Sequence, residues 1–190
     1  VKDKKLPNLC LLAAAQTRDK TAVNEEQIKA LIEDLRLLFD FILVDCPAGI
    51  ESGFQNSIAG ADIALIVVTP EMSSVRDADR IVGLLEARRD QFEGINLIIN
   101  RVRPGLMETN QMMTVEDIQE ILSVDLIGVV PDDEDIVIST NKGEPLVLTS
   151  NKNAGQAYKN IASRLLGEDV PFMNLSKGLG LMSKIKAIFR

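Results

Sequence analysis

Residues 63–69 (IALIVVT) and residues 95–100 (INLIIN) are two short apolar runs that decide the fold class. A strand that is apolar at nearly every position is buried on both faces, as in a parallel sheet that helices cover. Between the two runs, apolar residues recur every three or four positions, which predicts a helix over about residues 74–88. The order strand, helix, strand predicts a right-handed crossover in Rossmann-like layers.

The same alternation continues toward both ends of the chain. Apolar runs predict further strands at 9–15, 41–45, 126–130 and, as an edge strand that starts with a proline, 145–148. Helical spacing and capping residues predict helices at 25–39, 114–122 and 154–166. We therefore expect an α/β domain over residues 1–168, with a mostly parallel sheet and helices on both faces, then a linker at 169–175 and a C-terminal amphipathic helix at 176–190.

Composition excludes several classes of function. The 190 residues contain no His, which removes imidazole metal sites and Ser-His-Asp triads. The net charge of −7 disfavours a general nucleic-acid binder, because phosphate recognition needs clustered Lys and Arg. No apolar run reaches the roughly 18 residues that span a bilayer, and no signal peptide opens the sequence. We expect a soluble, cytoplasmic protein.

Asp45 and Gly49 are candidate phosphate-site residues. Ligands of parallel sheets bind at the carboxyl ends of the strands, and Asp45 ends the predicted strand 41–45. Four hydrophobic residues followed by Asp have the form of a Walker B element, whose carboxylate holds a Mg²⁺-bound water. Gly49 would let a backbone N–H approach a γ-phosphate closely. The alternative is that Asp45 only ends a strand and caps the next turn.

The string DCPAGIE at 45–51 closely resembles the switch II segment of the MinD-type ATPases, which place the bacterial division site and belong to the deviant-Walker P-loop (MinD/ParA) family. The resemblance extends through residues 70–77 (PEMSSVRD), 143–145 (GEP), 157–158 (AY) and 164–168 (RLLGE), and so covers essentially the whole chain. It implies a P-loop NTPase fold, ATP hydrolysis, and ATP and Mg²⁺ as cofactors.

The resemblance also implies where the adenine binds. An asparagine at the end of the strand 95–100 contacts the base in this family, so Asn100, Pro131 and Asp132 become candidate adenine contacts. The amide of Asn100 offers both a donor and an acceptor, although an asparagine here could simply form a turn. We interpret the acidic run 132–135 as a solvated helix N-terminus rather than a metal cage.

The family's glycine-rich P-loop and switch I aspartate have no counterpart in these residues. No G-x-x-x-x-G-K-S/T motif occurs, and the chain opens with Val1 instead of a glycine-rich segment. We therefore expect a fold that is incomplete at its N-terminus, with the sequence starting partway into a gene product. We also expect no ATPase activity from this polypeptide alone.

Residues 176–190 form a basic tail with four cations and no acid. The 17 remaining Lys and Arg against 28 Asp and Glu leave the preceding residues with a net charge of −11. On a helix, the apolar side chains fall on one half of the circumference and the cations on its margins, an arrangement suited to anionic lipid headgroups. The candidate membrane residues are Leu179, Met182, Lys184, Ile185, Lys186, Ile188 and Phe189.

By resemblance, ATP would bridge a homodimer that binds the membrane, and stimulated hydrolysis would release it. The implied partners are MinC, which inhibits division-ring assembly, and MinE, which stimulates hydrolysis. The implied location is peripheral on the cytoplasmic face of the cell membrane, or its plastid equivalent. Two alternatives remain open: a ParA-like ATPase that partitions DNA or other cargo, which the acidic body disfavours, and a truncated, non-catalytic membrane adaptor.

Overall fold

The structure is a computed structural model that describes residues 1–13, 23–47 and 49–175. It divides into two units, Val1–Ala61 and Asp62–Arg190, which are described separately here.

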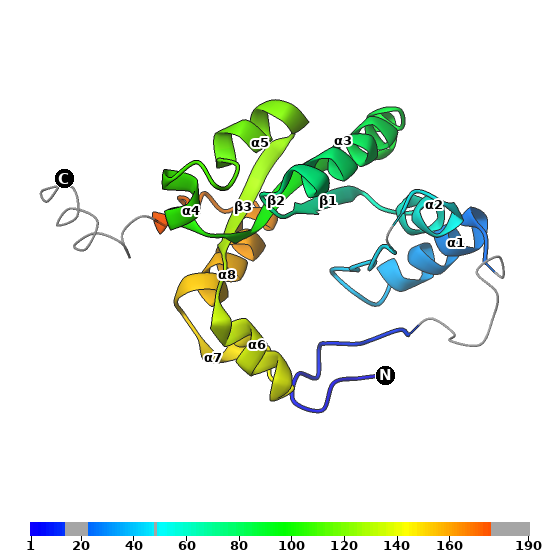
Figure 1. The fold of residues 1–190 in the computed structure, drawn as a ribbon. Helices are drawn as coiled ribbons and strands as arrows, with labels where there is room; N and C mark the ends of the chain where they lie inside the picture. Colours follow the sequence, from blue (N-terminus) through cyan, green and yellow to red (C-terminus); the bar gives the residue numbers. More distant parts are fainter. Residues whose placement is uncertain (14–22, 48, 176–190) are drawn as a thin grey trace, which may run out of the picture. The chain divides into compact units, whose positions relative to one another are not determined.

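The second unit is built on a parallel sheet of three strands in the order β1–β2–β3 (Figure 1). The strands are β1 (Ile63–Val68), β2 (Gly94–Val102) and β3 (Asp125–Pro131). β1 pairs with β2 without a break, whereas the pairing of β2 with β3 shifts register after Leu97 and again after Ile99. The sheet confirms the predicted parallel topology and three of the predicted strands.

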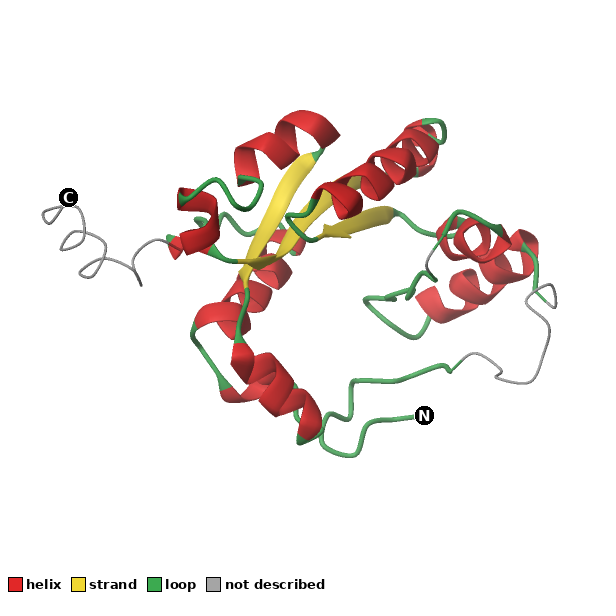
Figure 2. Cartoon of the chain, in the orientation of Figure 1, coloured by secondary structure: helices red, strands yellow, loops and turns green. Residues whose placement is uncertain are grey.

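Helices cover both faces of this sheet, as predicted (Figures 1 and 2). Helices α3 (Met72–Glu86) and α5 (Val115–Leu122) lie on one face, and α8 (Asn153–Leu165) packs on the other, against β3. The shorter elements are the 3₁₀ helix η1 (Arg89–Gln91), α4 (Pro104–Glu108), α6 (Glu134–Asn141) and α7 (Leu146–Thr149).

The core of the second unit has one layer on each side of β2. Side chains alternate between the faces of a strand, so Leu97 and Ile99 point away from the face that holds Ile98. Leu97 and Ile99 are fully buried, as are Val75 of α3 and Ile118 of α5. On the opposite face, a cluster of buried apolar residues joins β2 and β3 to α8, and it comprises Ile98, Ile127, Val130, Ala154, Ala157 and Ile161.

Local signals at two helix ends are also confirmed. Thr114 caps α5 through the N–H of Asp117, and the carboxylate of Asp117 accepts the N–H of Thr114. The Thr114 side chain, followed by its backbone, lowers the pKa of Asp117. Gly167 follows the end of α8 with φ of +83°, the left-handed conformation that glycine adopts at helix ends without a side-chain clash.

The predicted edge strand at 145–148 is wrong, because this segment forms α7. The carbonyl of Pro145 accepts the N–H of Leu148 at 3.0 Å, and the carbonyl of Leu146 accepts the N–H of Ser150 at 2.9 Å. Those backbone groups are satisfied within the turn, so the segment needs no neighbouring strand.

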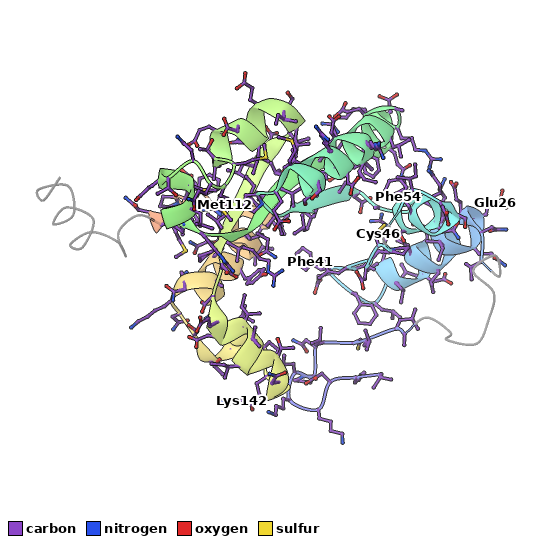
Figure 3. All side chains as sticks on the ribbon, in the orientation of Figure 1. Glu26, Phe41, Cys46, Phe54, Met112 and Lys142 are labelled. Atoms are coloured by element: carbon purple, nitrogen blue, oxygen red, sulfur yellow. The ribbon has the colours of Figure 1, made fainter. Side chains whose placement is uncertain are left out.

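In the first unit, α1 (Glu25–Arg36) packs against α2 (Ser52–Ile58). Asn24 and Gln27 form a reciprocal capping box that begins α1, which confirms the predicted helix. Ile32 of α1 is buried, as are Phe54 and Ile58 of α2, and Phe54 is labelled in Figure 3.

Two predicted strands of the first unit are not formed. Residues 41–45 contain no helix or strand, with Phe41 and Leu43 exposed, and Phe41 is labelled on this segment in Figure 3. Within residues 9–13, the described part of the predicted strand 9–15, only Cys10 forms an isolated bridge, with Lys2. An apolar run becomes a strand only when a neighbour accepts its hydrogen bonds, and the described residues of this unit contain no paired strand that could do so.

The packing of β3 against α8 can be tested at Gly128. A Cβ built on Gly128 would overlap Cγ1 and Cδ1 of Ile161, so Gly128→Ala requires the Ile161 side chain or the helix that carries it to shift. We expect Gly128→Ala to lower the free energy of unfolding by about 1–3 kcal/mol in urea denaturation.

Gly83→Ala is the matched control, because Gly83 lies within α3 and its built Cβ meets nothing within 4 Å. Alanine there should be neutral or stabilise by up to about 1 kcal/mol. Equal effects of the two substitutions would contradict the close approach of α8 to β3.

Candidate functional site

Strand β2 contains a bulge at Asn100 and Arg101, near its carboxyl end. Between Ile99 and Val102 the register against β3 shifts, and Arg101 has φ of +59°, a left-handed conformation that is uncommon for residues other than glycine. The Oδ1 of Asn100 accepts the N–H of Arg101 at 2.9 Å. Pro104 then begins α4 at a position where its missing N–H costs nothing. The last residues of β2 thus include one strained backbone conformation, a feature that clusters at functional sites.

Arg103 and Asp132 connect the loop after β2 to the loop after β3. The Nε of Arg103 donates to Oδ2 of Asp132 at 2.6 Å, and the N–H of Asp132 donates to the carbonyl of Val102 at 2.9 Å. The Arg103 side chain is 61% exposed and that of Asp132 is 30% exposed, so both remain accessible to a ligand.

A cavity of about 680 Å³ opens beside this ion pair. Its lining comes from both loops, from the start of α8 and from the segment after α8, and comprises residues 102–106, 131, 132, 134, 153 and 173–175. Small-molecule pockets have volumes of about 300–1,000 Å³, and parallel sheets bind ligands at the carboxyl ends of their strands. The size and the place of the cavity therefore suit an organic ligand.

Asp133 joins the N-termini of two helices whose first residues line this cavity. Its Oδ1 accepts the N–H of Asp135 at 3.0 Å and begins α6, and its Oδ2 accepts the N–H of Ala154 at 3.2 Å in the first turn of α8. This confirms that the acidic run 132–135 lies at a helix N-terminus. Asn153, which lines the cavity next to this cap, has φ of +48°.

Of the three candidate adenine residues, the structure brings Pro131 and Asp132 into the cavity lining. Asn100 lies two residues before that lining begins, half-buried in β2. Sequence reasoning missed Arg103, Glu134, Asn153 and the segment 173–175. The Arg-Pro pair at 103–104 marks the end of a strand, but no local pattern places residues 173–175 beside it.

The candidate phosphate-site residues lie in the first unit. Asp45 is exposed on a segment without helix or strand, so it does not end a strand as predicted. Gly49 is also exposed and has φ of +95°, a conformation that favours glycine, and a Cβ built on it meets nothing within 4 Å. Cys46, labelled in Figure 3, is a free thiol, as is Cys10.

Comparisons with known proteins identify a nucleotide-binding family. Residues 7–146 match the CobQ/CobB/MinD/ParA nucleotide binding domain family. Over 92% of its length, the chain is 57% identical to a septum site-determining protein MinD of Synechocystis sp.. The chain belongs to the MinD family. It spans 65% of that relative's length.

Two solved MinD structures share the fold. The MinC:MinD cell division protein complex of Aquifex aeolicus aligns with a TM-score of 0.82 and 42% identity over 92% of this chain and 69% of that chain. The septum site-determining protein MinD of Pyrococcus horikoshii, complexed with Mg-ADP, aligns with a TM-score of 0.63 and 26% identity over 75% of this chain and 56% of that one. The described sheet and helices are therefore part of a MinD-family P-loop NTPase fold.

The seven candidate membrane residues lie outside the described residues. Among the helices of the described part, none combines the length and the apolar character that crossing a bilayer requires.

The double cap at Asp133 generates a prediction about the architecture of the site. Asp133→Ala removes the acceptors of two backbone N–H groups, so we expect the free energy of unfolding to fall by about 1–3 kcal/mol in urea denaturation. Asp135→Ala is the control, because it removes a neighbouring exposed carboxylate of the same helix turn but no cap. Equal losses would show that charge near the helix end, rather than the capping bonds, stabilises this region.

Proposed function

We propose that this chain is the base-binding and membrane-binding part of a MinD-type ATPase that takes part in placing the division site. The observation that carries the proposal is the cavity at the carboxyl ends of β2 and β3, in a chain of a nucleotide-binding domain family. ATP would bridge two copies, the dimer would hold to the membrane, and stimulated hydrolysis would release it.

The cavity would take the adenine base. Pro131 and Asp132 supply a backbone carbonyl and a carboxylate, and Glu134 adds a second carboxylate. These acceptors suit the exocyclic amino group of adenine, whereas guanine presents an acceptor at the corresponding position. The side-chain amide of Asn100 would add a further contact to the base from the bulge in β2.

Mg²⁺ would be held through water by Asp45, since Mg²⁺ in nucleotide sites takes one or two protein carboxylates together with phosphate oxygens. The exposed carboxylate of Asp45 and the glycine backbone at Gly49 fit such a role. The Mg-ADP bound to the Pyrococcus horikoshii relative supports ATP and Mg²⁺ as the cofactors. Because the 190 residues contain no P-loop motif, we infer that this polypeptide alone does not turn over ATP.

The partners we propose are a MinC-like division inhibitor, a MinE-like activator and an anionic membrane on the cytoplasmic side. The Aquifex aeolicus MinC:MinD complex supports the first of these. The membrane is supported by the change from a body of net −11 to a tail with four cations and a broad apolar arc. One such helix binds weakly, and two on a dimer gain avidity.

Nucleotide selectivity tests the proposed base site. We expect Mg-ADP to displace a fluorescent ADP analogue from the chain more effectively than Mg-GDP does. Asp132→Ala should weaken ADP binding about 5- to 10-fold, because it removes an acceptor and the partner of Arg103.

Asp125→Ala is the matched control, since Asp125 is an exposed aspartate at the opposite end of the same strand. Binding of no nucleotide, or equal binding of ADP and GDP, would contradict the proposed base site.

Membrane binding is tested separately by vesicle flotation. We expect the chain to float with vesicles of phosphatidylglycerol and phosphatidylcholine, and much less with phosphatidylcholine alone. Ile185→Glu should abolish flotation, because it places a charge on the apolar arc of the tail. The control is Ile138→Glu, which changes an exposed isoleucine of α6. Flotation of Ile185→Glu at the wild-type level would contradict the proposal.

A further inference from the structure

Arg164, in the last turn of α8, fastens the chain that follows the helix. Its Nη1 donates to the carbonyl of Ile127 in β3 at 2.9 Å, its Nε to the carbonyl of Val170 at 2.9 Å, and its Nη2 to the carbonyl of Pro171 at 3.0 Å. The rigid planar fork of a guanidinium can meet three carbonyls at once, whereas a lysine ammonium is a point charge on a flexible stem.

The same guanidinium also lies over an aromatic ring. Its central carbon is 4.1 Å from the ring centroid of Phe172, which is within the range of a cation–π interaction. Phe172 is 50% exposed, so half of the ring lies outside the packed interior. The Arg164 guanidinium therefore links residues 170–172 to β3. It binds the backbone carbonyls of Val170 and Pro171 and the ring of Phe172.

The next three residues return to the cavity. Met173, Asn174 and Leu175 line the cavity together with Arg103 and Asp132. Met173 also packs against the apolar cluster that joins β2 and β3 to α8. The segment 170–172, which Arg164 holds, is thus followed directly by residues 173–175, which contact both the core and the cavity.

We infer that residues 173–175 form a wall of the nucleotide base site, with Arg164 as the positioning residue that holds this wall in place. The inference rests on the proposed function, because it assigns the base to this cavity. The wall brings a polarisable thioether and an amide with both a donor and an acceptor, groups that suit the face and the edge of a purine.

Coupling of this wall to the ligand is reciprocal: a base that holds the wall is also held by it. Arg164→Lys keeps the charge but cannot span three carbonyls. We expect Arg164→Lys to weaken binding of Mg-ADP about 5- to 10-fold, because the loss of one or two hydrogen bonds leaves residues 173–175 less firmly held. Arg89→Lys is the matched control, because Arg89 also donates to a backbone carbonyl, that of Phe92 at 2.8 Å, and does not line the cavity.

Amide hydrogen exchange gives a readout that a purely structural role would not change. In the wild-type chain, saturating Mg-ADP should slow exchange at residues 173–175, and in Arg164→Lys, also saturated with Mg-ADP, this protection should be smaller. A merely structural role would lower the melting temperature and leave the protection by bound nucleotide unchanged.

The outcomes separate the inference from the proposed function. Binding of Mg-ADP without protection of 173–175, or with equal affinity for wild type and Arg164→Lys, overturns the inference and leaves the proposed function standing. Failure of the wild-type chain to bind Mg-ADP overturns both.

Discussion

Strand β2 has to satisfy hydrogen bonds on both of its edges and bury side chains on both of its faces, and the rest of the second unit depends on this constraint. It pairs with β1 on one side and β3 on the other, and Leu97, Ile98 and Ile99 are all buried. A strand in this position needs a helical layer on each side. Helices α3 and α5 supply one layer, and α8 supplies the other.

The same strand determines where the cavity forms. Regular pairing with β3 stops at the bulge at Asn100 and Arg101 and resumes at Val102, opposite Pro131. Beyond this point the segments that follow the two strands diverge, one into α4 and the other into α6. The Arg103–Asp132 ion pair connects these segments. The cavity lies where the two chains separate, as expected at the carboxyl edge of a parallel sheet.

Much of this architecture could be predicted from local patterns. The apolar runs at 63–69, 95–100 and 126–130 became strands because each found a neighbour, and the Thr114–Asp117 capping box is a purely local interaction. The run at 41–45 has the same composition, but in the structure it has no strand beside it, so the pattern alone misled. Of the site, Pro131 and Asp132 were predicted through the family resemblance, which points to the end of this strand. The segment 173–175 was not, since its place depends on the long-range bond from Arg164 to Ile127.

The charges around the cavity bear on which part of a nucleotide it would take. Asp132 and Glu134 bring two carboxylates and Arg103 one guanidinium, which is already paired with Asp132. Phosphate groups bind free N–H groups at helix N-termini, lysines and metal ions. At this cavity Asp133 already accepts an N–H group at the start of α6 and one at the start of α8, and the two carboxylates would repel a phosphate. A neutral base with an amino donor meets no such repulsion. In the proposed complex, the base would therefore enter this cavity, while the phosphates would bind groups outside its lining.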